Sequence, residues 1–457
     1  MSILSGVLAA LCFPRFNLFL LAWVCLIPLF IEINKKEHPK KAALSGFLFG
    51  IFFFGQNLLW INTLNEFVPG YTALGYVFLV LYESAFTAAA CYLIKYLSIN
   101  LPAINLLSIP LTWTFFEWIR TLGPFGISAG DIGYSQATIT PLIQIASFST
   151  VFGVSFMIVM VNAAIADAKR SIWKISAVLI IVFLSCFWGL SQIPKELKPA
   201  LNQIGSWPAS KVLTFSLIQG NIPQKIKLDA RYNNEIFTIH EDMTRKIISE
   251  KPDIIIWPES VVLAYLTSEP SFLKRVVKLA KDSKAFILIG TPFDDGKGKI
   301  YNSLIAFSPS GEVIGRYDKR RLVPFGEYLP LRFLLYPILR STDFFYEDFD
   351  FGPEEAQIIE INGIKIGAAI CFESTFVDPL RDRGNLLLTV TNDAWFGSSS
   401  AAYEHLNCGI FRAVENRKYF IQTGNTGISA VIDPYGRILA RTKLNERTTL
   451  TFKVPLP

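Results

Sequence analysis

Long apolar runs fill the first 190 residues or so of this chain. A helix needs about 20 predominantly apolar residues to cross a bilayer. Six apolar runs come close to this length or exceed it and are candidate spans: Leu18–Ile33, Ala42–Leu64, Tyr71–Leu93, Pro102–Ile119, Pro141–Ala166 and Ile172–Leu190. The short apolar stretch Ser2–Phe13 adds a seventh span, or half of a re-entrant hairpin that turns at CFPRF. The sequence therefore predicts a transmembrane helical bundle over residues 1–193.

The composition changes after this region. Only 18% of all residues are charged, whereas an ordinary soluble domain has about 25%, and the deficit lies in the first part of the chain. Residues 194–210 contain Pro194, Pro199 and Pro208, which favours a linker. We therefore expect a linker at 194–210, followed by a soluble domain at 211–457.

Lysine and arginine residues in short loops predict the orientation of a membrane protein, because such loops stay in the cytoplasm. Positive charges gather in three loops, each two spans from the next: Lys35, Lys36, Lys40 and Lys41; Lys95; and Lys169, Arg170 and Lys174. The chain leaves its last span on the opposite side of the membrane. We therefore expect the soluble domain to be extracytoplasmic.

Ionisable residues inside predicted spans indicate functional sites by default. Glu83, Glu117 and Arg120 lie in or near such spans. Glu117 and Arg120 are one helical turn apart, so they can pair with each other at a helix end. We expect that pairing and assign no catalytic role to these residues.

Short β-rich runs alternate with helical stretches in the second part of the chain. The strand candidates are Val212–Leu217, Asp253–Trp257, Phe286–Gly290, Ser303–Phe307, Ile364–Ile370, Leu386–Thr391 and Ile428–Ile432. The helix candidates are Asn233–Ser249, Pro270–Asp282 and Tyr403–Arg417. This alternation favours an α/β fold in which some neighbouring strands are joined through helices.

The content of cysteine, histidine and basic residues excludes some classes of function. The six cysteines are scattered, there are three histidines, and no CxxC or Cys/His cluster occurs, so we expect no metal and no cofactor. Only Cys371 and Cys408 belong to the soluble part, and a disulfide between them stays open. The net charge of +6 is modest, without a basic stripe that contains aromatic residues, so nucleic acid is not an expected partner.

Three reactive residues follow strand candidates, where α/β proteins build their sites. Glu259 follows DIIIW, Lys319 follows a hairpin-like pair of strands, and Cys371 follows IKIGAAI. A thiol with a pKa of about 8.5 needs a base or a cation before it attacks a carbonyl. Glu259 could serve as the base, and Lys319 could stabilise an oxyanion together with the backbone N–H of Phe372. Each residue alone is more often structural, and only the combination points to acyl chemistry.

The motifs around these residues carry a resemblance to a known family. WPES, YDKRRLVPFGEYLP and CFES resemble the Glu–Lys–Cys motifs of the nitrilase, or carbon–nitrogen hydrolase, superfamily. LIQGNIPQ, TNDAWFG, RAVENRKYFIQTGNTGISAVIDPYG and the preceding bundle narrow the resemblance to the apolipoprotein N-acyltransferase family. It covers nearly the whole chain. It implies an αββα sandwich attached to a membrane bundle in the bacterial inner membrane.

The resemblance also implies the roles of individual residues. Cys371 would take an acyl chain from a phospholipid as a thioester, Glu259 would be general base and acid, and Lys319 would stabilise the oxyanion. Glu327 and Glu373 match supporting acidic positions. The acceptor would be the α-amine of the diacylglyceryl-cysteine of an apolipoprotein, and ping-pong kinetics would follow. We expect a monomer that contacts the lipid bilayer.

Three departures from the family pattern stand out. Phe372 replaces a tyrosine, Leu228 replaces a frequent tryptophan, and the chain ends at FKVPLP, where relatives continue into one more membrane helix. Residues 331–351 form an apolar stretch between catalytic motifs, which we interpret as an arm or lid that touches lipid. Two other functions use the same sequence features: a membrane-anchored amidase that transfers the acyl group to water, and a catalytically inactive lipid-binding protein.

Overall fold

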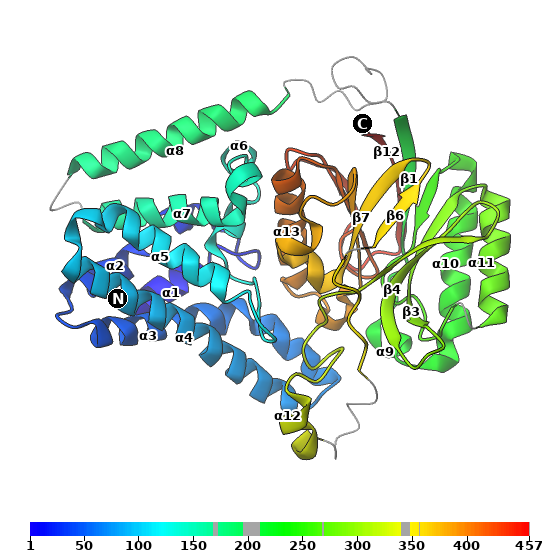
Figure 1. The fold of residues 1–457 in the computed structure, drawn as a ribbon, viewed down its shortest axis with the longest axis horizontal. Coiled ribbons are helices and arrows are strands. Elements are labelled where there is room, and N and C mark those ends of the chain that lie inside the picture. Colours follow the sequence, from blue (N-terminus) through cyan, green and yellow to red (C-terminus); the bar gives the residue numbers. More distant parts are fainter. Residues whose placement is uncertain (168–171, 195–210, 267–268, 340–347, 356, 457) are drawn as a thin grey trace. The chain divides into compact units, whose positions relative to one another are not determined.

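The computed structural model describes residues 1–167, 172–194, 211–266, 269–339, 348–355 and 357–456 (Figure 1). The chain forms two compact units. The first unit comprises Met1–Pro194 and Ser399–Glu415, and the second comprises Lys195–Ser398 and Asn416–Pro457. Apart from Pro194, the predicted linker at 194–210 lies outside the described residues, as do Lys169 and Arg170 of the third basic loop.

The first unit is helical. Its α-helices are α1 (Ser2–Ala10), α2 (Ile27–Lys35), α3 (Pro39–Asn57), α4 (Tyr71–Asn100), α5 (Asn105–Ile119), α6 (Thr140–Ile143), α7 (Ala146–Ala166), α8 (Ile172–Gln192) and α13 (Ala401–Asn416). The 3-10 helices Phe19–Trp23, Leu59–Glu66, Pro102–Ile104 and Ile132–Gln136 lie between them. The chain turns after Ala10, within the CFPRF stretch, where the Leu18 N–H donates to the Leu11 carbonyl at 2.9 Å.

Three helices in the described residues are long and apolar enough to cross a membrane: α4, α7 and α8. A fourth span would combine α3 with Leu59–Glu66, which bend by 47° at the break between them. The predicted spans at 18–33 and 102–119 contain shorter helices. In the first, α2 begins only next to Pro28, a residue that favours the first turn of a helix; in the second, α5 begins only after Pro102. The number of membrane crossings therefore stays a prediction.

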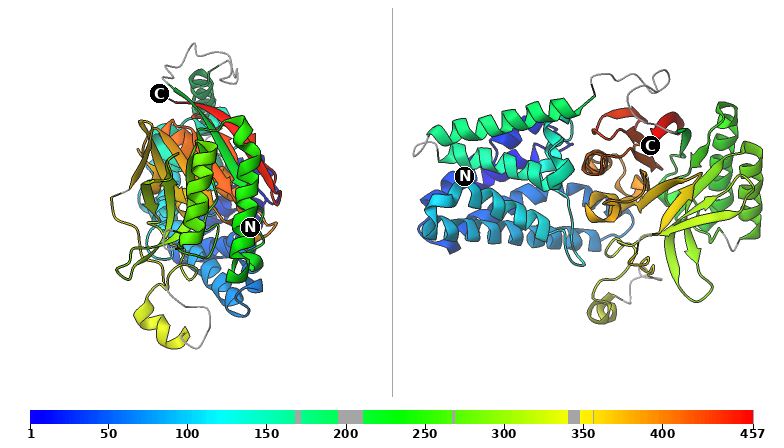
Figure 2. Two further views of the ribbon diagram at one scale, coloured as in Figure 1. Left: turned by 90° about the vertical axis from the view of Figure 1, so that its right-hand side faces the viewer. Right: turned by 45° about the horizontal axis from the view of Figure 1, so that its top comes forward.

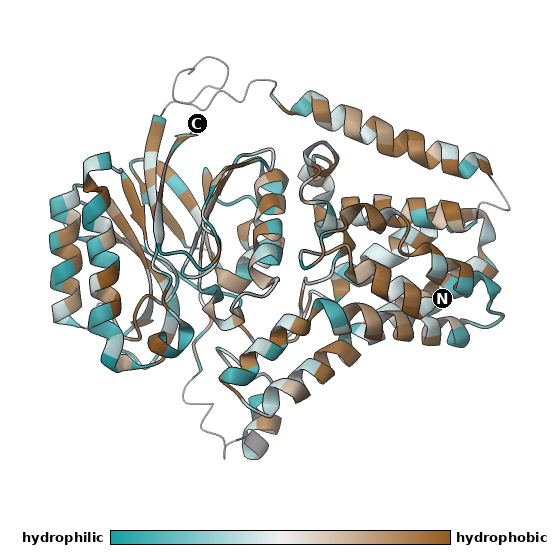
Figure 3. Ribbon diagram, turned by 180° about the vertical axis from the view of Figure 1, so that it is seen from behind, coloured by the Kyte–Doolittle hydropathy of each residue, from teal (hydrophilic) through white to brown (hydrophobic). Residues whose placement is uncertain are grey.

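Helix α8 exposes nearly all of its apolar surface. Only 11% of the residues in its most apolar window are buried, and Figure 3 shows the helix brown, that is hydrophobic, along most of its length. Helices α10 (Asn233–Ile247) and α11 (Pro270–Ser283) of the second unit instead alternate between teal and brown (Figure 3). Apolar side chains that no protein surface covers are typical of a helix in contact with lipid.

The second unit contains two sheets of six strands. The first sheet has the order β12-β1-β2-β3-β4-β5, and the second has the order β11-β10-β9-β8-β7-β6. Their bounds are β1 (Lys211–Gln219), β2 (Ile254–Ile256), β3 (Phe286–Asp294), β4 (Ile300–Phe307), β5 (Val313–Asp318), β6 (Ile358–Ile361), β7 (Ile364–Ile370), β8 (Leu386–Thr391), β9 (Phe420–Gly424), β10 (Ala430–Ile432), β11 (Ile438–Arg441) and β12 (Thr448–Leu456). The central pairs β1–β2, β2–β3, β7–β8 and β8–β9 are parallel.

The period of two along the strands divides the core into layers. Alternate side chains such as Ile254 and Ile256 pack against the second sheet, where Ile366 and Leu388 face them. The intervening Ile255 contacts the opposite layer, which α10 and α11 form over the outer face of the first sheet. Figures 1 and 2 show these two helices side by side in green. The predicted fold class, a helical membrane bundle followed by a nitrilase-like αββα domain, is confirmed.

Candidate active site

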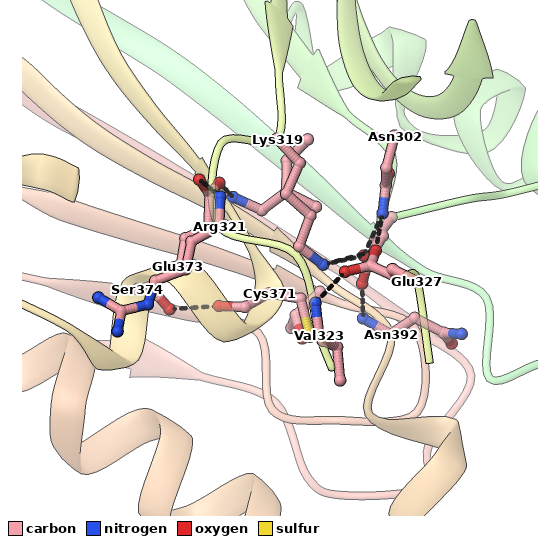
Figure 4. A network of polar contacts seen from close by, with 12 residues as sticks. Asn302, Lys319, Arg321, Val323, Glu327, Cys371, Glu373, Ser374 and Asn392 are labelled. Atoms are coloured by element: carbon pink, nitrogen blue, oxygen red, sulfur yellow. Dashed lines mark hydrogen bonds and ion pairs between the residues drawn. The ribbon is translucent and has the colours of Figure 1, made fainter. Parts of the chain in front are cut away.

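The nucleophile candidate Cys371 lies at a sharp turn of the backbone. Strand β7 ends at Ile370, and a 3-10 helix begins at Cys371. Cys371 has φ of 50°, a left-handed conformation that is uncommon for a residue other than glycine. The Ser374 hydroxyl donates to the Cys371 carbonyl at 2.9 Å and holds this turn (Figure 4). Strained backbone of this kind gathers at functional sites.

Lys319 lies between two carboxylates. It directly follows β5, and its side chain is only 1% exposed. Its Nζ donates to Glu259 Oε1 at 3.2 Å and to Glu327 Oε1 at 2.9 Å, and Figure 4 shows the contact with Glu327. An ammonium group has three donors. These two bonds therefore leave one donor of Lys319 for another acceptor.

Glu259 and Glu327 are both fixed by further hydrogen bonds. The Asn302 side chain donates to Oε1 of Glu259 at 2.8 Å and to Oε1 of Glu327 at 2.7 Å. The backbone N–H of Asn392 donates to Glu259 Oε2 at 2.9 Å, and that of Val323 donates to Glu327 Oε2 at 2.7 Å. Both carboxylates therefore have a fixed orientation around Lys319, and Figure 4 shows Glu327 beside it.

The charges of this cluster act on the thiol of Cys371. Burial raises the pKa of Cys371 well above its ordinary value, and the negative charge of Glu259 raises it further, while Lys319 acts in the opposite direction. Burial alone would lower the pKa of Lys319, but Glu259 and Glu327 raise it above its ordinary value. The resting site therefore holds a neutral thiol and a charged ammonium. Lys319 alone does not generate a thiolate, so the chemistry requires a base.

Glu373 connects the nucleophile to the segment that carries Lys319. Its Oε1 accepts hydrogen bonds from the N–H groups of Arg320 and Arg321 at 2.8 and 3.0 Å, and its Oε2 accepts one from the Ile370 N–H at 2.8 Å. The Tyr317 hydroxyl donates to the same carboxylate. Glu373 is fully buried. It fixes the backbone on both sides of the site.

Phe372 directly follows the nucleophile, and its ring packs edge-to-face against Phe376 with centroids 4.8 Å apart. The Arg321 guanidinium lies over the other aromatic ring, that of Phe376. An aromatic contact thus occupies the position where the family pattern has a tyrosine. The role of the Phe372 N–H as an oxyanion donor stays a prediction.

Sequence reasoning gave no role to Asn302, Asn392, Gln224 and Lys227, which also belong to this site. Asn392 Nδ2 donates to Gln224 Oε1 at 2.9 Å, and Lys227 Nζ donates to the Glu259 carbonyl at 3.0 Å. Gln224, Lys227 and Asn392 lie in or beside the quoted motifs QGNIPQ and TNDAWFG, which was a usable signal. Asn302 lies inside β4 in an ordinary strand pattern, without such a signal.

The ionisable residues of the first unit pair differently from the prediction. Arg120 donates to Glu83 at 2.9 Å and to Asp131 at 2.5 Å. Glu117 instead accepts hydrogen bonds from Trp113 Nε1 and the Ile132 N–H. Arg120 therefore connects two helices and a loop, because Glu83 of α4 is within its reach. All six cysteines lie in described residues, and none of them forms a disulfide, Cys371 and Cys408 included.

Comparison with known proteins decides which family has this site. Residues 5–164 match the apolipoprotein N-acyltransferase N-terminal domain, and residues 216–457 match the carbon-nitrogen hydrolase family. The chain is 34% identical to the apolipoprotein N-acyltransferase of Geobacter metallireducens, over 100% of this chain and 89% of that relative. The chain belongs to the apolipoprotein N-acyltransferase family. The family predicted from the motifs is confirmed.

The chain is also similar to other relatives and to solved structures. The apolipoprotein N-acyltransferase of Pasteurella multocida is 32% identical over 99% of this chain and 88% of its own length. Among solved structures, a CN-hydrolase superfamily protein from Xanthomonas campestris is 19% identical, with a TM-score of 0.40 over 53% of this chain and 91% of its own. An amidase from Nesterenkonia sp. is 18% identical, with a TM-score of 0.40 over 53% and 90%.

Proposed function

We propose that this chain transfers an acyl chain from a membrane phospholipid to the α-amine of the diacylglyceryl-cysteine of an apolipoprotein. Cys371 carries the acyl group as a thioester, Glu259 moves the protons, and Lys319 stabilises the oxyanion. Glu327 and Glu373 support the site by holding Lys319 and the backbone around Cys371. The observation that carries the proposal is the contact of Lys319 with both Glu259 and Glu327. The charges of Lys319 and Glu259 both act on the thiol of Cys371.

In the first half of the reaction, Glu259 takes the proton of the Cys371 thiol, and the sulfur attacks the ester carbonyl of the phospholipid. The S–C bond forms, and the carbonyl oxygen becomes an oxyanion. The remaining donor of Lys319 and the Phe372 N–H stabilise this oxyanion. The C–O bond then breaks, and the leaving lysophospholipid oxygen takes the proton from Glu259.

In the second half, the neutral α-amine of the apolipoprotein attacks the thioester carbonyl. Glu259 accepts a proton from the amine as the C–N bond forms. The tetrahedral intermediate collapses, the C–S bond breaks, and the proton returns from Glu259 to Cys371. The acyl group thus moves through one covalent intermediate, for which ping-pong kinetics are expected.

We infer a bacterial inner-membrane location with the catalytic domain on the extracytoplasmic side. The apolar helices α4, α7 and α8 support a membrane protein. Lys35 at the end of α2 and Lys95 in α4 belong to loops or helix ends on the side that the positive-inside rule assigns to the cytoplasm. The acyl donor and the acceptor are both lipids, so a site at the bilayer surface also keeps water from the thioester.

The decisive experiment is intact-mass spectrometry of the purified protein after incubation with a phospholipid and no acceptor. We expect an added acyl mass that is absent in Cys371→Ser, present in Cys408→Ala, and discharged by a diacylglyceryl peptide. An acyl mass on Cys371→Ser would overturn the role of this cysteine.

A membrane-anchored amidase is the second candidate, because it uses the same three residues. The similarity to apolipoprotein N-acyltransferases extends over the bundle as well as the catalytic domain, which favours acyl transfer. Discharge of the acyl-enzyme by water alone, with no transfer to the peptide, would favour the amidase. An unmodified wild-type protein with every lipid would favour the inactive lipid-binding protein.

A further inference from the structure

A second lysine is buried beside the base. Lys227 ends the short helix α9 (Gln224–Lys227), and its side chain is only 4% exposed. Its Nζ donates to the backbone carbonyl of Glu259 at 3.0 Å. Lysines are almost never buried without a partner that requires them. The acyl transfer mechanism derived above does not use this residue.

The short helix separates inward polar residues from outward apolar ones. Gln224 and Lys227 are three residues apart, so they share one face, and both are buried. Ile226 and Leu228 are exposed, at 36% and 44%. The inward face of α9 thus contacts residues of the candidate active site, Glu259 and Asn392.

Helix α9 holds Glu259 at two points. Lys227 binds its backbone carbonyl directly. Gln224 Oε1 accepts from the Asn392 side chain at 2.9 Å, and the Asn392 N–H donates to Glu259 Oε2 at 2.9 Å. Strand β2 ends at Ile256, before Glu259, and the residue after Glu259, Ser260, has φ of 45°, so the backbone around Glu259 is not part of the sheet. A donor is therefore supplied where the sheet no longer provides one.

The charge of Lys227 also changes the balance of the site. Lys319 carries one positive charge against the carboxylates of Glu259 and Glu327. Lys227 adds a second positive charge, which acts on both Glu259 and Cys371. A nearby cation favours the ionised carboxylate before the proton transfer and the thiolate after it, so the site keeps a negative charge beside Lys227 throughout this step.

We propose that Lys227 is a positioning residue for acyl-enzyme formation, whose ammonium group fixes the backbone of Glu259 and places a positive charge beside the site where Glu259 accepts the thiol proton of Cys371. This inference rests on the proposed function. It assigns Lys227 to the first half of the reaction, because proton transfer from Cys371 occurs there. It predicts that the loss of the charge and the loss of the rate coincide.

The direction of the pH dependence follows from the groups that face Lys227. Burial lowers the pKa of Lys227 to about 7, while the charges of Glu259 and Cys371 act in the opposite direction. His240 of α10 also interacts with Lys227, and burial lowers the pKa of His240 to about 4, so it is neutral throughout this range. Lys227 is charged below its pKa. The rate of acyl-enzyme formation should therefore fall as the pH rises through about 7.

The test measures acyl-enzyme formation by intact mass, with phospholipid and no acceptor, from about pH 6 to about pH 8, which brackets the pKa of Lys227. Lys227→Met removes the charge at similar length. At the acidic end of the range, we expect Lys227→Met to form the acyl-enzyme about 10²-fold more slowly than the wild type, with an unchanged KM for phospholipid. The rate of this variant should not fall as the pH rises. Lys227→Arg keeps the charge, so its rate should exceed that of Lys227→Met and stay level across the range. Lys225→Met, on the same helix at an exposed position, is the matched control and should behave as the wild type.

The outcomes separate this inference from the proposed function. A wild-type protein that forms no acyl-enzyme overturns the proposed function. A wild-type protein that forms it, with Lys227→Met giving the same rate and the same pH profile, overturns the role of Lys227 alone. If Lys227→Met does not fold, the pH profiles of the wild type and of Lys227→Arg decide. The role of Lys227 is overturned if the wild-type rate does not fall as the pH rises. It is also overturned if the rate of Lys227→Arg falls with pH as the wild-type rate does.

Discussion

Glu373 accepts a hydrogen bond from the backbone N–H of Arg320 at 2.8 Å. Arg320 follows Lys319 in the chain, and Glu373 lies two residues after Cys371, so this contact joins the segments of two proposed catalytic residues. The remaining partners of Glu373 are also donors, namely the N–H groups of Ile370 and Arg321 and the hydroxyl of Tyr317. The carboxylate therefore acts as an acceptor for several groups at once.

Glu373→Gln should lower both stability and activity. The glutamine NH₂ group would face donors that need an acceptor, and an unsatisfied buried group costs about 1–3 kcal/mol. We expect a lower unfolding temperature for the detergent-solubilised protein and a rate of acyl-enzyme formation reduced at least about 10-fold. Glu360→Gln on the exposed face of β6 is the control. An inactive Glu373→Gln with an unchanged unfolding temperature would instead point to a direct chemical role.

Alkylation by iodoacetamide should separate the two effects of Glu259 on Cys371. The pKa of Cys371 is raised by burial and by the charge of Glu259, so the wild-type thiol should react slowly at neutral pH and faster as the pH rises. Glu259→Gln removes one cause of the raised pKa, so alkylation should begin at a lower pH. The same variant should form no acyl-enzyme, because the base is missing. Peptide mass spectrometry at Cys371 reads the alkylation, and slower alkylation of Glu259→Gln would contradict the assignment.

Lys319→Met should lower the rate of acyl-enzyme formation by about 10²–10³-fold, which is typical for the loss of one oxyanion donor. Its removal also leaves Glu259 and Glu327 next to each other without the cation that separates them. Lys297→Met, at an exposed turn, serves as the matched control. A near-normal rate in Lys319→Met would remove this residue from the reaction. The measurement is a time course of the acyl-enzyme mass.

The strand ends that carry the proposed catalytic residues could be read from the sequence. Cys371 follows β7 and Lys319 follows β5 without a gap, and Glu259 follows β2 closely. Asn302 could not be found in this way, because its role depends on the antiparallel pairing of β4 with β5, where Ser303 lies opposite Asp318. Strand β12 was missed for a similar reason, since it is fixed by pairing with β1 more than 200 residues earlier in the chain.

Exposed apolar residues of α12 (Arg332–Leu339) lie within the stretch that we interpreted as a lipid-contacting arm; residues 340–347 of that stretch lie outside the described residues. Phe333 is 83% exposed and Leu334 is 54% exposed. The double variant Phe333→Ser/Leu334→Ser should raise the KM for phospholipid in vesicles about 10-fold, because apolar contact with the bilayer is lost. Acylation by a short, water-soluble ester should be unaffected. Equal losses with both donors would show that α12 supports the site itself.

Glu415 of α13 connects a broken helix to a buried arginine. Helix α7 is interrupted at Thr150, which has φ of 58°, and the next N–H, that of Val151, donates to Glu415 Oε1 at 3.0 Å. Arg412 donates to the same oxygen at 2.7 Å and to the Tyr134 hydroxyl at 3.1 Å. Although α13 lies between β8 and β9 in the chain, Ser399–Glu415 belongs to the first unit. The cluster joins this inserted helix to α7 and to the 3-10 helix Ile132–Gln136.

Removing one charged partner of this cluster should lower the stability of the protein more than replacing both charged partners together. Arg412→Met leaves the carboxylate of Glu415 buried without its cation, and the loss of one partner of a buried pair typically costs about 3–5 kcal/mol. In Arg412→Met/Glu415→Gln the uncompensated charge is gone, while the glutamine oxygen can still accept from Val151. The double variant should therefore unfold at a higher temperature than Arg412→Met alone, as followed by thermal unfolding in detergent. Additive losses in the double-mutant cycle would contradict this coupling, because independent sites add.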